Sequence, residues 1–259
     1  MCKLKSAIIL KDRIFMPDYD SHSKMLEELG IEDNYINASK VFVRAELSPE
    51  EEDAFSNIDS WKLTVDQDII PAWFDRAECT ERMRTAVKEW AKTHIFIGQD
   101  CLNISHGENI FIKNCRNVNI YGDAKVELIC GESIVKEIYD KAKIHAICGN
   151  TAINRIGDAA TVEYIYENTT VAYISGNATV RSICGNAIIE CIYNNARVNS
   201  IYDDAEVREI SGEATIISSQ YIKWNKSNLL IITGNALFKD CYTKTIHHSG
   251  NWKLVKSKK

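Results

Sequence analysis

Hydrophobic and polar positions repeat with a period of nine across residues 121–219. Eleven consecutive units fit this pattern without an insertion. The sixth position is always Val or Ile, the fourth is always Ala, Ser or Thr, and the ninth is Ile in ten of the eleven units. The second and third positions are mostly Gly, Asp, Asn or Glu, which suit a turn. Each unit is therefore predicted to be a short strand followed by a corner.

Positions four and six point to the same side of such a strand, because side chains alternate along it. A single unit cannot bury this narrow apolar edge, whereas stacked parallel copies can. The sequence therefore predicts a mainly β protein built around a parallel β-solenoid. An irregular lead-in precedes the regular units, and one further unit follows them at residues 233–241.

The number of units in one coil of the solenoid follows less directly. Three units give a 27-residue coil, which would stack Tyr139, Tyr166 and Tyr193 on one another. Two units give an 18-residue coil, supported by the alternation of Tyr and Cys at the first position of the first four units. The stacks are more uniform for 27 residues, so we expect a three-sided coil.

In a three-sided coil, Tyr139, Tyr166 and Tyr193 would form an aromatic ladder along one edge. Stacked aromatic side chains stabilise a sheet by cross-strand contact. Tyrosine is also favoured at protein interfaces. The three tyrosines are therefore candidate binding residues, with a purely stabilising role as the alternative.

The first hundred residues show no repeat and are predicted to form a small α+β domain. We expect strands in residues 6–15, 40–47 and 61–65, a helix capped by Ser21, and a short helix after the capping box that begins at Ser48. Apolar residues at helical spacing predict a longer amphipathic helix over residues 75–94. This helix is expected to cap the solenoid, because an open solenoid end exposes unpaired strand edges.

The predicted organisation is thus an α+β module (1–100), a solenoid (101–241) and a tail (242–259). Charge divides the chain differently: residues 1–100 carry a net charge of −7, residues 101–219 carry −5, and residues 220–259 carry +7. No apolar run approaches the roughly 18 residues that a membrane-spanning helix needs, and no signal peptide is evident, so a cytoplasmic protein is expected. The nine cysteines show no metal-type spacing and are expected to be reduced.

The basic C-terminal segment also contains aromatic residues, which include Trp224, Lys226, Trp252 and Lys253. Lysines and aromatic rings together can follow a nucleic-acid backbone and stack on bases. The same segment could instead cover the end of the solenoid. It could also dock on the acidic body of a second copy and form a homodimer.

The sequence contains few candidates for chemistry. Asp18, Asp20 and His22 could bind a metal or a small ligand, but a capped helix start has the same composition. The His247–His248 pair lacks a second ligand pair at zinc spacing, and His145 has no visible partner. The nucleophile-elbow, phosphate-loop, dinucleotide and zinc-protease motifs are absent, as are calcium-binding GGxGxD turns. We therefore predict no catalytic residue, cofactor or metal, and no enzymatic activity.

Residues 61–67, 71–74 and 86–92, followed by units such as 176–180, resemble uncharacterised proteins of gut bacteria and their phages. Those proteins place a small α+β module before a pentapeptide-like or nonapeptide solenoid. The resemblance implies a phage or mobile-element accessory protein, and it supplies no activity or site residues. The resulting hypothesis is a non-enzymatic solenoid that binds a host macromolecule, most readily a protein, for example to inhibit a defence system. The alternatives are a small-ligand-binding or enzymatic N-terminal domain, and nucleic-acid binding through the tail.

Overall fold

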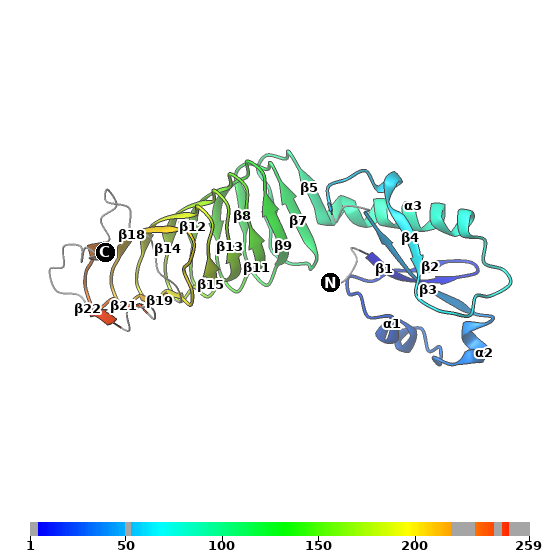
Figure 1. Ribbon diagram of the computed structural model, residues 1–259. Helices are drawn as coiled ribbons and strands as arrows, with labels where there is room; N and C mark the ends of the chain where they lie inside the picture. Colours follow the sequence, from blue (N-terminus) through cyan, green and yellow to red (C-terminus); the bar gives the residue numbers. More distant parts are fainter. Residues whose placement is uncertain (1–4, 50–52, 219–230, 241–244, 249–259) are drawn as a thin grey trace. The chain divides into compact units, whose positions relative to one another are not determined.

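The computed structural model describes residues 5–49, 53–218, 231–240 and 245–248. The chain divides into two compact units, Met1–Ile95 and Phe96–Lys259. Each unit has its own sheets, and Figure 1 shows the stacked solenoid strands of the second unit.

The N-terminal unit is an antiparallel sheet with the strand order β2-β1-β3-β4. Its strands are β1 (Lys5–Leu10), β2 (Ile14–Phe15), β3 (Phe42–Ser48) and β4 (Lys62–Val65), and its helices are α1 (His22–Glu28), α2 (Tyr35–Ala38) and α3 (Arg76–His94), with a 3₁₀ turn at Ile58–Ser60. All three strands expected from the sequence are present, the first of them as the hairpin β1–β2.

The sheet lies between α1 and α3 (Figure 1). Ile8 on β1 packs with Met25 and Leu26 of α1. The next residue, Ile9, packs with Cys79 of α3 on the opposite face. Because β1 is covered on both faces, all six of its residues are buried, and residues 7–10 are apolar without alternation.

Capping residues explain where the helices begin. Ser21 Oγ accepts a hydrogen bond from Lys24 N at 3.3 Å, which confirms the predicted cap of α1. The helix expected after Ser48 falls mainly on residues 50–52, which lie outside the described residues, and residues 53–57 after them form turns. Ser48 itself is the last residue of β3 and pairs with Lys62 in the β3–β4 ladder.

Asp75 caps the longest helix, α3, and its removal gives a testable prediction. Its carboxylate accepts a hydrogen bond from Glu78 N at 2.8 Å. Asp75→Ala is expected to lower the free energy of unfolding of the N-terminal unit by about 1 kcal/mol, because a helix N–H loses its acceptor. Urea unfolding measures this change. Asp75→Asn retains the acceptor and should cost less, so equal losses in the two variants would contradict the capping role.

In the described part of the chain, the second unit consists of two sheets that share one core. The eight-stranded sheet contains β6 (Asn103–Ile104), β8 (Val118–Ile120), β10 (Ile134–Ile138), β12 (Ala152–Ile156), β14 (Thr170–Ile174), β16 (Ile188–Ile192), β18 (Glu206–Ile210) and β20 (Ile231–Ile232). The ten-stranded sheet contains β5 (Ile95–Ile97), β7 (Ile110–Lys113), β9 (Lys125–Cys130), β11 (Lys143–Ile147), β13 (Thr161–Ile165), β15 (Thr179–Ile183), β17 (Arg197–Val198), β19 (Thr215–Ser218), β21 (Leu237–Asp240) and β22 (Thr245–His248). Strands β7 to β21 pair in parallel within their sheets, and β22 is antiparallel to β21.

The parallel solenoid is confirmed, but the 27-residue coil is wrong. Val135 pairs with Ile153, and Val162 pairs with Val180, so each coil contains 18 residues and two strands. Alternate units therefore belong to opposite sheets. At each corner the second position has positive φ, for example 56° at Asp140 and 58° at Glu167. The chain thus reverses in one short turn, and two such turns close a coil.

The inward positions are those that the repeat predicted. In the coil around β13, Ala160, Val162 and Ile165 occupy positions four, six and nine and are buried. Equivalent residues in neighbouring coils belong to the same continuous core. The stacked ladders of Ala, Val and Ile therefore hold the two sheets together.

Polar corner residues connect successive coils. The Glu167 carboxylate accepts a hydrogen bond from Gly149 N at 2.8 Å. Asn168 donates to the side chain of Asn150 at 3.1 Å, and Asn186 donates to Asn168 at 3.2 Å. These carboxylates and amides thus stabilise the stack of corners. Their hydrogen bonds explain why polar residues recur at the corners, and no bound metal is needed to explain them.

Candidate interaction surface

The predicted tyrosine ladder does not form, because the 18-residue coil separates its members. Tyr139 and Tyr193 lie at one corner of the coils, whereas Tyr166 lies at the other. Tyr139 stacks on Tyr121 with ring centroids 5.2 Å apart and an interplanar angle of 10°. Tyr193 makes an edge contact with Tyr173 at 6.1 Å. The three residues therefore have separate local partners and form no common recognition strip.

The other candidate residues divide into two groups. Trp224, Lys226, Trp252 and Lys253 lie outside the described residues. The described candidates of the N-terminal unit have contacts with other protein groups: Asp20 accepts from Ser6 N at 3.3 Å, and His22 Nδ1 lies 3.3 Å from Asp66 Oδ2. Asp18 Oδ1 lies 3.2 Å from His94 Nε2. Asp18 and Asp20 also both lie close enough to the buried Lys5 ammonium to oppose the lowering of its pKa by burial, whereas His22 contacts Asp66. No group of three potential metal ligands occurs among the described residues.

The outer face of the ten-stranded sheet carries a group that we call the His145–Arg181 cluster, defined as His145, Glu163, Tyr164 and Arg181. These residues come from three consecutive strands, β11, β13 and β15, of which the last two pair in register at Tyr164 and Ser182. His145, Glu163 and Arg181 all occupy position seven of their units. The 18-residue coil therefore places them in one column.

Glu163 is the centre of the charged contacts in the cluster. Its Oε2 atom lies 3.2 Å from His145 Nδ1 and 3.7 Å from Arg181 Nη1. The side chains of His145, Glu163 and Arg181 are 53%, 49% and 62% exposed, so the cluster lies on an open face. Solvent weakens ion pairs at such exposed positions. The ion pairs of the cluster therefore contribute little to the stability of the fold.

Tyr164 lies between His145 and Arg181. Its ring makes an edge contact with His145 at 5.5 Å, and the Arg181 guanidinium lies 5.7 Å from its centroid. Directly beside it along β13, Val162 and Ile165 are buried in the core. The backbone that carries the tyrosine is thus held by the sheet ladder on both sides.

Basic side chains exceed acidic ones on this face of the solenoid. Position five contributes Lys125, Lys143 and Arg197, and position seven contributes Glu127 beside the cluster. Lys125 forms an ion pair with Glu108, and Arg197 donates to Asn199 at 2.9 Å. The acidic character of the solenoid comes largely from its corners, so this face differs in charge from the body as a whole.

The expectation that His145 has no partner is wrong. Glu163 follows it by 18 residues, so a 27-residue coil concealed the contact, whereas an 18-residue alignment of the units places 145, 163 and 181 in one column. The signal was therefore present in the repeat, but it depended on the coil size.

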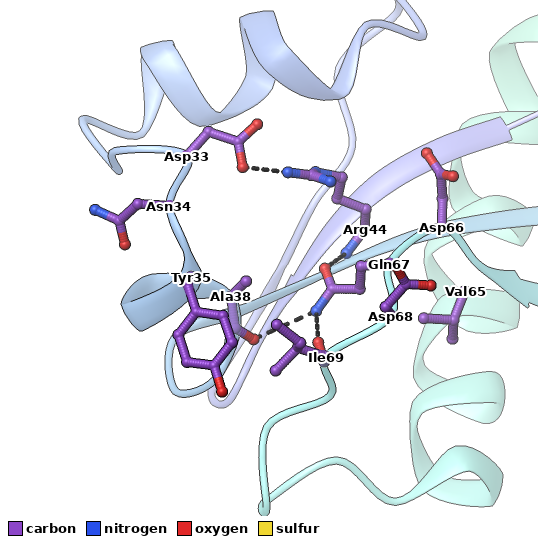
Figure 2. A pocket seen from close by; sticks show the side chains of 10 residues that line it. All are labelled: Asp33, Asn34, Tyr35, Ala38, Arg44, Val65, Asp66, Gln67, Asp68 and Ile69. Carbon is purple, nitrogen blue, oxygen red and sulfur yellow. Dashed lines mark hydrogen bonds and ion pairs between the residues drawn. The ribbon is translucent and has the colours of Figure 1, made fainter.

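The N-terminal unit contains a pocket of about 600 Å³ beside α2. Figure 2 shows Arg44 between Asp33, with which it forms an ion pair, and the side chain of Gln67. Gln67 donates to Ile69 O at 2.6 Å and accepts from Arg44 N at 2.9 Å. The lining residues are Asp33, Asn34, Tyr35, Ala38, Arg44, Val65, Asp66, Gln67, Asp68 and Ile69.

Most polar groups of this pocket already have protein partners. Asp66 contacts His22, Asp33 contacts Arg44, and Gln67 holds the backbone. Three carboxylates around one guanidinium make the lining acidic, which disfavours an anionic ligand. Neither Asp18, Asp20 nor His22 lines the pocket, so it is not the ligand site expected from the sequence.

Comparisons with protein-family models, with curated proteins and with solved structures gave no match to this chain. None of the helices in the described part of the chain is long and apolar enough to cross a membrane. The fold nevertheless defines the class of the C-terminal unit, which is a two-sided parallel β-solenoid with an 18-residue coil.

Proposed function

We propose that the solenoid is a non-enzymatic recognition module that binds a partner protein through the outer face of its ten-stranded sheet. The His145–Arg181 cluster forms the centre of this binding surface. Following the resemblance to proteins of gut bacteria and their phages, the chain acts as a phage or mobile-element accessory protein. Its partner is then a host protein, for example a component of a defence system.

The observation that carries this proposal is the position of Tyr164 between His145 and Arg181 on adjacent parallel strands. Tyrosine and arginine are over-represented among the residues that dominate binding energies at protein interfaces. A residue that is held rigidly before binding loses less conformational entropy when the partner arrives. The sheet ladder thus supports an anchor that needs little reorganisation.

The charge of the face favours a partner with an acidic patch. Lys143 and Arg181 are exposed on the same face as Tyr164. Complementary charge raises association rates and disfavours wrong partners. The open position of the cluster argues against acid–base catalysis by His145 and Glu163, because enzymes generally surround such groups with a concave site.

Site-specific photo-crosslinking tests the proposal, with a matched position on each face. Thr179 on β15 and Thr170 on β14 occupy position five of successive units and are both partly exposed. A photo-reactive amino acid at 179, in lysate of the native host cell, should give one discrete protein adduct. The same residue at 170 should not, and Arg181→Glu should abolish the adduct at 179. Equal crosslinking at both positions, or none at 179, would reject this surface.

A second candidate function is small-ligand binding by the N-terminal unit. The pocket beside α2 favours it, and the acidic lining indicates a cationic ligand. It has less support, since a ligand would have to displace existing contacts of Arg44 and Gln67. Homodimerisation and nucleic-acid binding through the C-terminal segment involve residues outside the described ranges and stay predictions.

A further inference from the structure

One corner of the solenoid carries a column of thiols and phenols, here called the thiol column. Its members occupy position one of every second unit, and backbone hydrogen bonds join consecutive coils beside them. Cys148 N donates to Ile129 O at 2.9 Å, and Cys184 N donates to Ile165 O at 2.9 Å. The members are Cys130, Cys148, Tyr166, Cys184 and Tyr202.

Cys130 and Cys148 are neighbours in this column. Neighbouring strands lie about 4.8 Å apart. This spacing falls within the range of Cα separations, roughly 4.4–6.8 Å, that a disulfide bridges. Backbone hydrogen bonds from Cys148 N to Ile129 O at 2.9 Å and from Asn150 N to Gly131 O at 2.8 Å flank the pair, so the two thiols occupy equivalent places in adjacent coils.

The remaining thiol of the column has a different setting. Cys184 lies between Tyr166 and Tyr202, so no thiol occupies the adjacent coils at its position. Outside the column, Cys191 pairs in register with Tyr173 and Glu209. Of the four cysteines Cys130, Cys148, Cys184 and Cys191, only Cys130 and Cys148 therefore have a thiol at the same position of the adjacent coil.

Hydrogen bonding also distinguishes Cys148 chemically. The hydrogen bond from Cys130, reinforced by one from Tyr166, lowers the pKa of the Cys148 thiol to about 7, against the opposing effects of burial and Glu167. Burial instead raises the pKa of Cys184 and of Cys191. The thiolate is the nucleophilic form of cysteine. At neutral pH a much larger fraction of Cys148 than of Cys184 or Cys191 is therefore in the thiolate form.

We propose that Cys148 and Cys130 form a peroxide-reactive dithiol site, in which Cys148 is oxidised first and Cys130 then closes a disulfide between adjacent coils. This inference is independent of the proposed binding function. Cys148 is only 9% exposed and Cys130 is partly exposed. Because so little of the Cys148 side chain is exposed, the oxidant must be a small molecule, namely hydrogen peroxide or another small hydroperoxide.

The reaction balances in two steps. The Cys148 thiolate attacks one oxygen of hydrogen peroxide, the O–O bond breaks, and the departing hydroxide takes up a proton, which leaves a sulfenic acid and one water. The Cys130 sulfur then attacks the Cys148 sulfur, the S–O bond breaks, and a second water leaves with the proton from Cys130. Two thiols are oxidised by two electrons in total, and the peroxide is reduced to two waters.

Peptide mapping of the full-length protein tests the proposal. The reduced protein is separated from reductant, treated with hydrogen peroxide, and alkylated to block the remaining thiols. A Cys130–Cys148 disulfide should be the main link, about tenfold more abundant than any link to Cys184 or Cys191, because those thiols are mostly protonated and lack a facing thiol. Dithiothreitol should reverse it.

Three variants assign the roles of the two cysteines. Cys148→Ser should abolish the link, whereas Cys130→Ser should leave a sulfenic acid at Cys148 that a 1,3-dione traps. Cys184→Ser is the matched control from the same column and should leave the link unchanged. A map of the unmodified chain in which Cys148 stays reduced, or is linked mainly to another cysteine, would overturn the proposal even if a variant failed to fold.

Discussion

Replacing Ile165 with alanine is expected to lower the free energy of unfolding of the solenoid by about 2–5 kcal/mol. Ile165 occupies position nine of its unit, is fully buried, and aligns with Ile147 and Ile183 in the adjacent coils. The substitution removes buried methyl groups and leaves a cavity that a rigid stack of strands can close only in part. Urea unfolding followed by far-ultraviolet circular dichroism measures the loss.

Ile134→Ala provides the matched control, because it makes the same chemical change in the same solenoid. Ile134 occupies position five of β10, points outward and is 45% exposed. Its truncation removes little buried area and should cost less than about 1 kcal/mol. Similar losses for the two variants would contradict the assignment of position nine to the core and position five to the surface.

Tyr164→Ala is expected to weaken binding of the partner protein by about 30-fold, which corresponds to about 2 kcal/mol. The substitution removes the ring that lies between His145 and Arg181, and with it the cation–π contact of the guanidinium. The dissociation constant for the protein identified by crosslinking at position 179 can be measured by isothermal titration calorimetry.

Tyr173→Ala is the corresponding control on the other sheet. Tyr173 occupies the same position of the next unit, in β14, and is 45% exposed. It should leave the affinity within about twofold of the unmodified protein, since an exposed residue outside the interface contributes little. Loss of binding in both variants would indicate a general effect on the solenoid, and loss only in Tyr173→Ala would place the interface on the eight-stranded sheet.

Local signals in the sequence were reliable where the physics that they report is local. Ser21 and Asp75 cap their helices because a side-chain oxygen needs only the N–H group three residues ahead. The helix expected after the capping box at Ser48 falls mainly on residues 50–52, which lie outside the described part of the chain.

The identification of the proposed binding surface depended on the number of units in one coil, which the repeat left open. Both a 27-residue and an 18-residue coil would bury positions four, six and nine, so the apolar pattern does not distinguish them. The choice nevertheless decides which outward residues meet. The expected ladder of Tyr139, Tyr166 and Tyr193 is replaced by the column that joins His145, Glu163 and Arg181.

The sequence by itself therefore determined the unit of this protein, a short strand whose inward side chains are small at position four and branched at positions six and nine. Alternation along a strand and the need to bury an apolar edge are enough to specify it. Only the tertiary structure decided that two units close a coil, because the turn angle at each corner depends on contacts between coils. That angle brings Glu163 to His145 and places Cys130 beside Cys148.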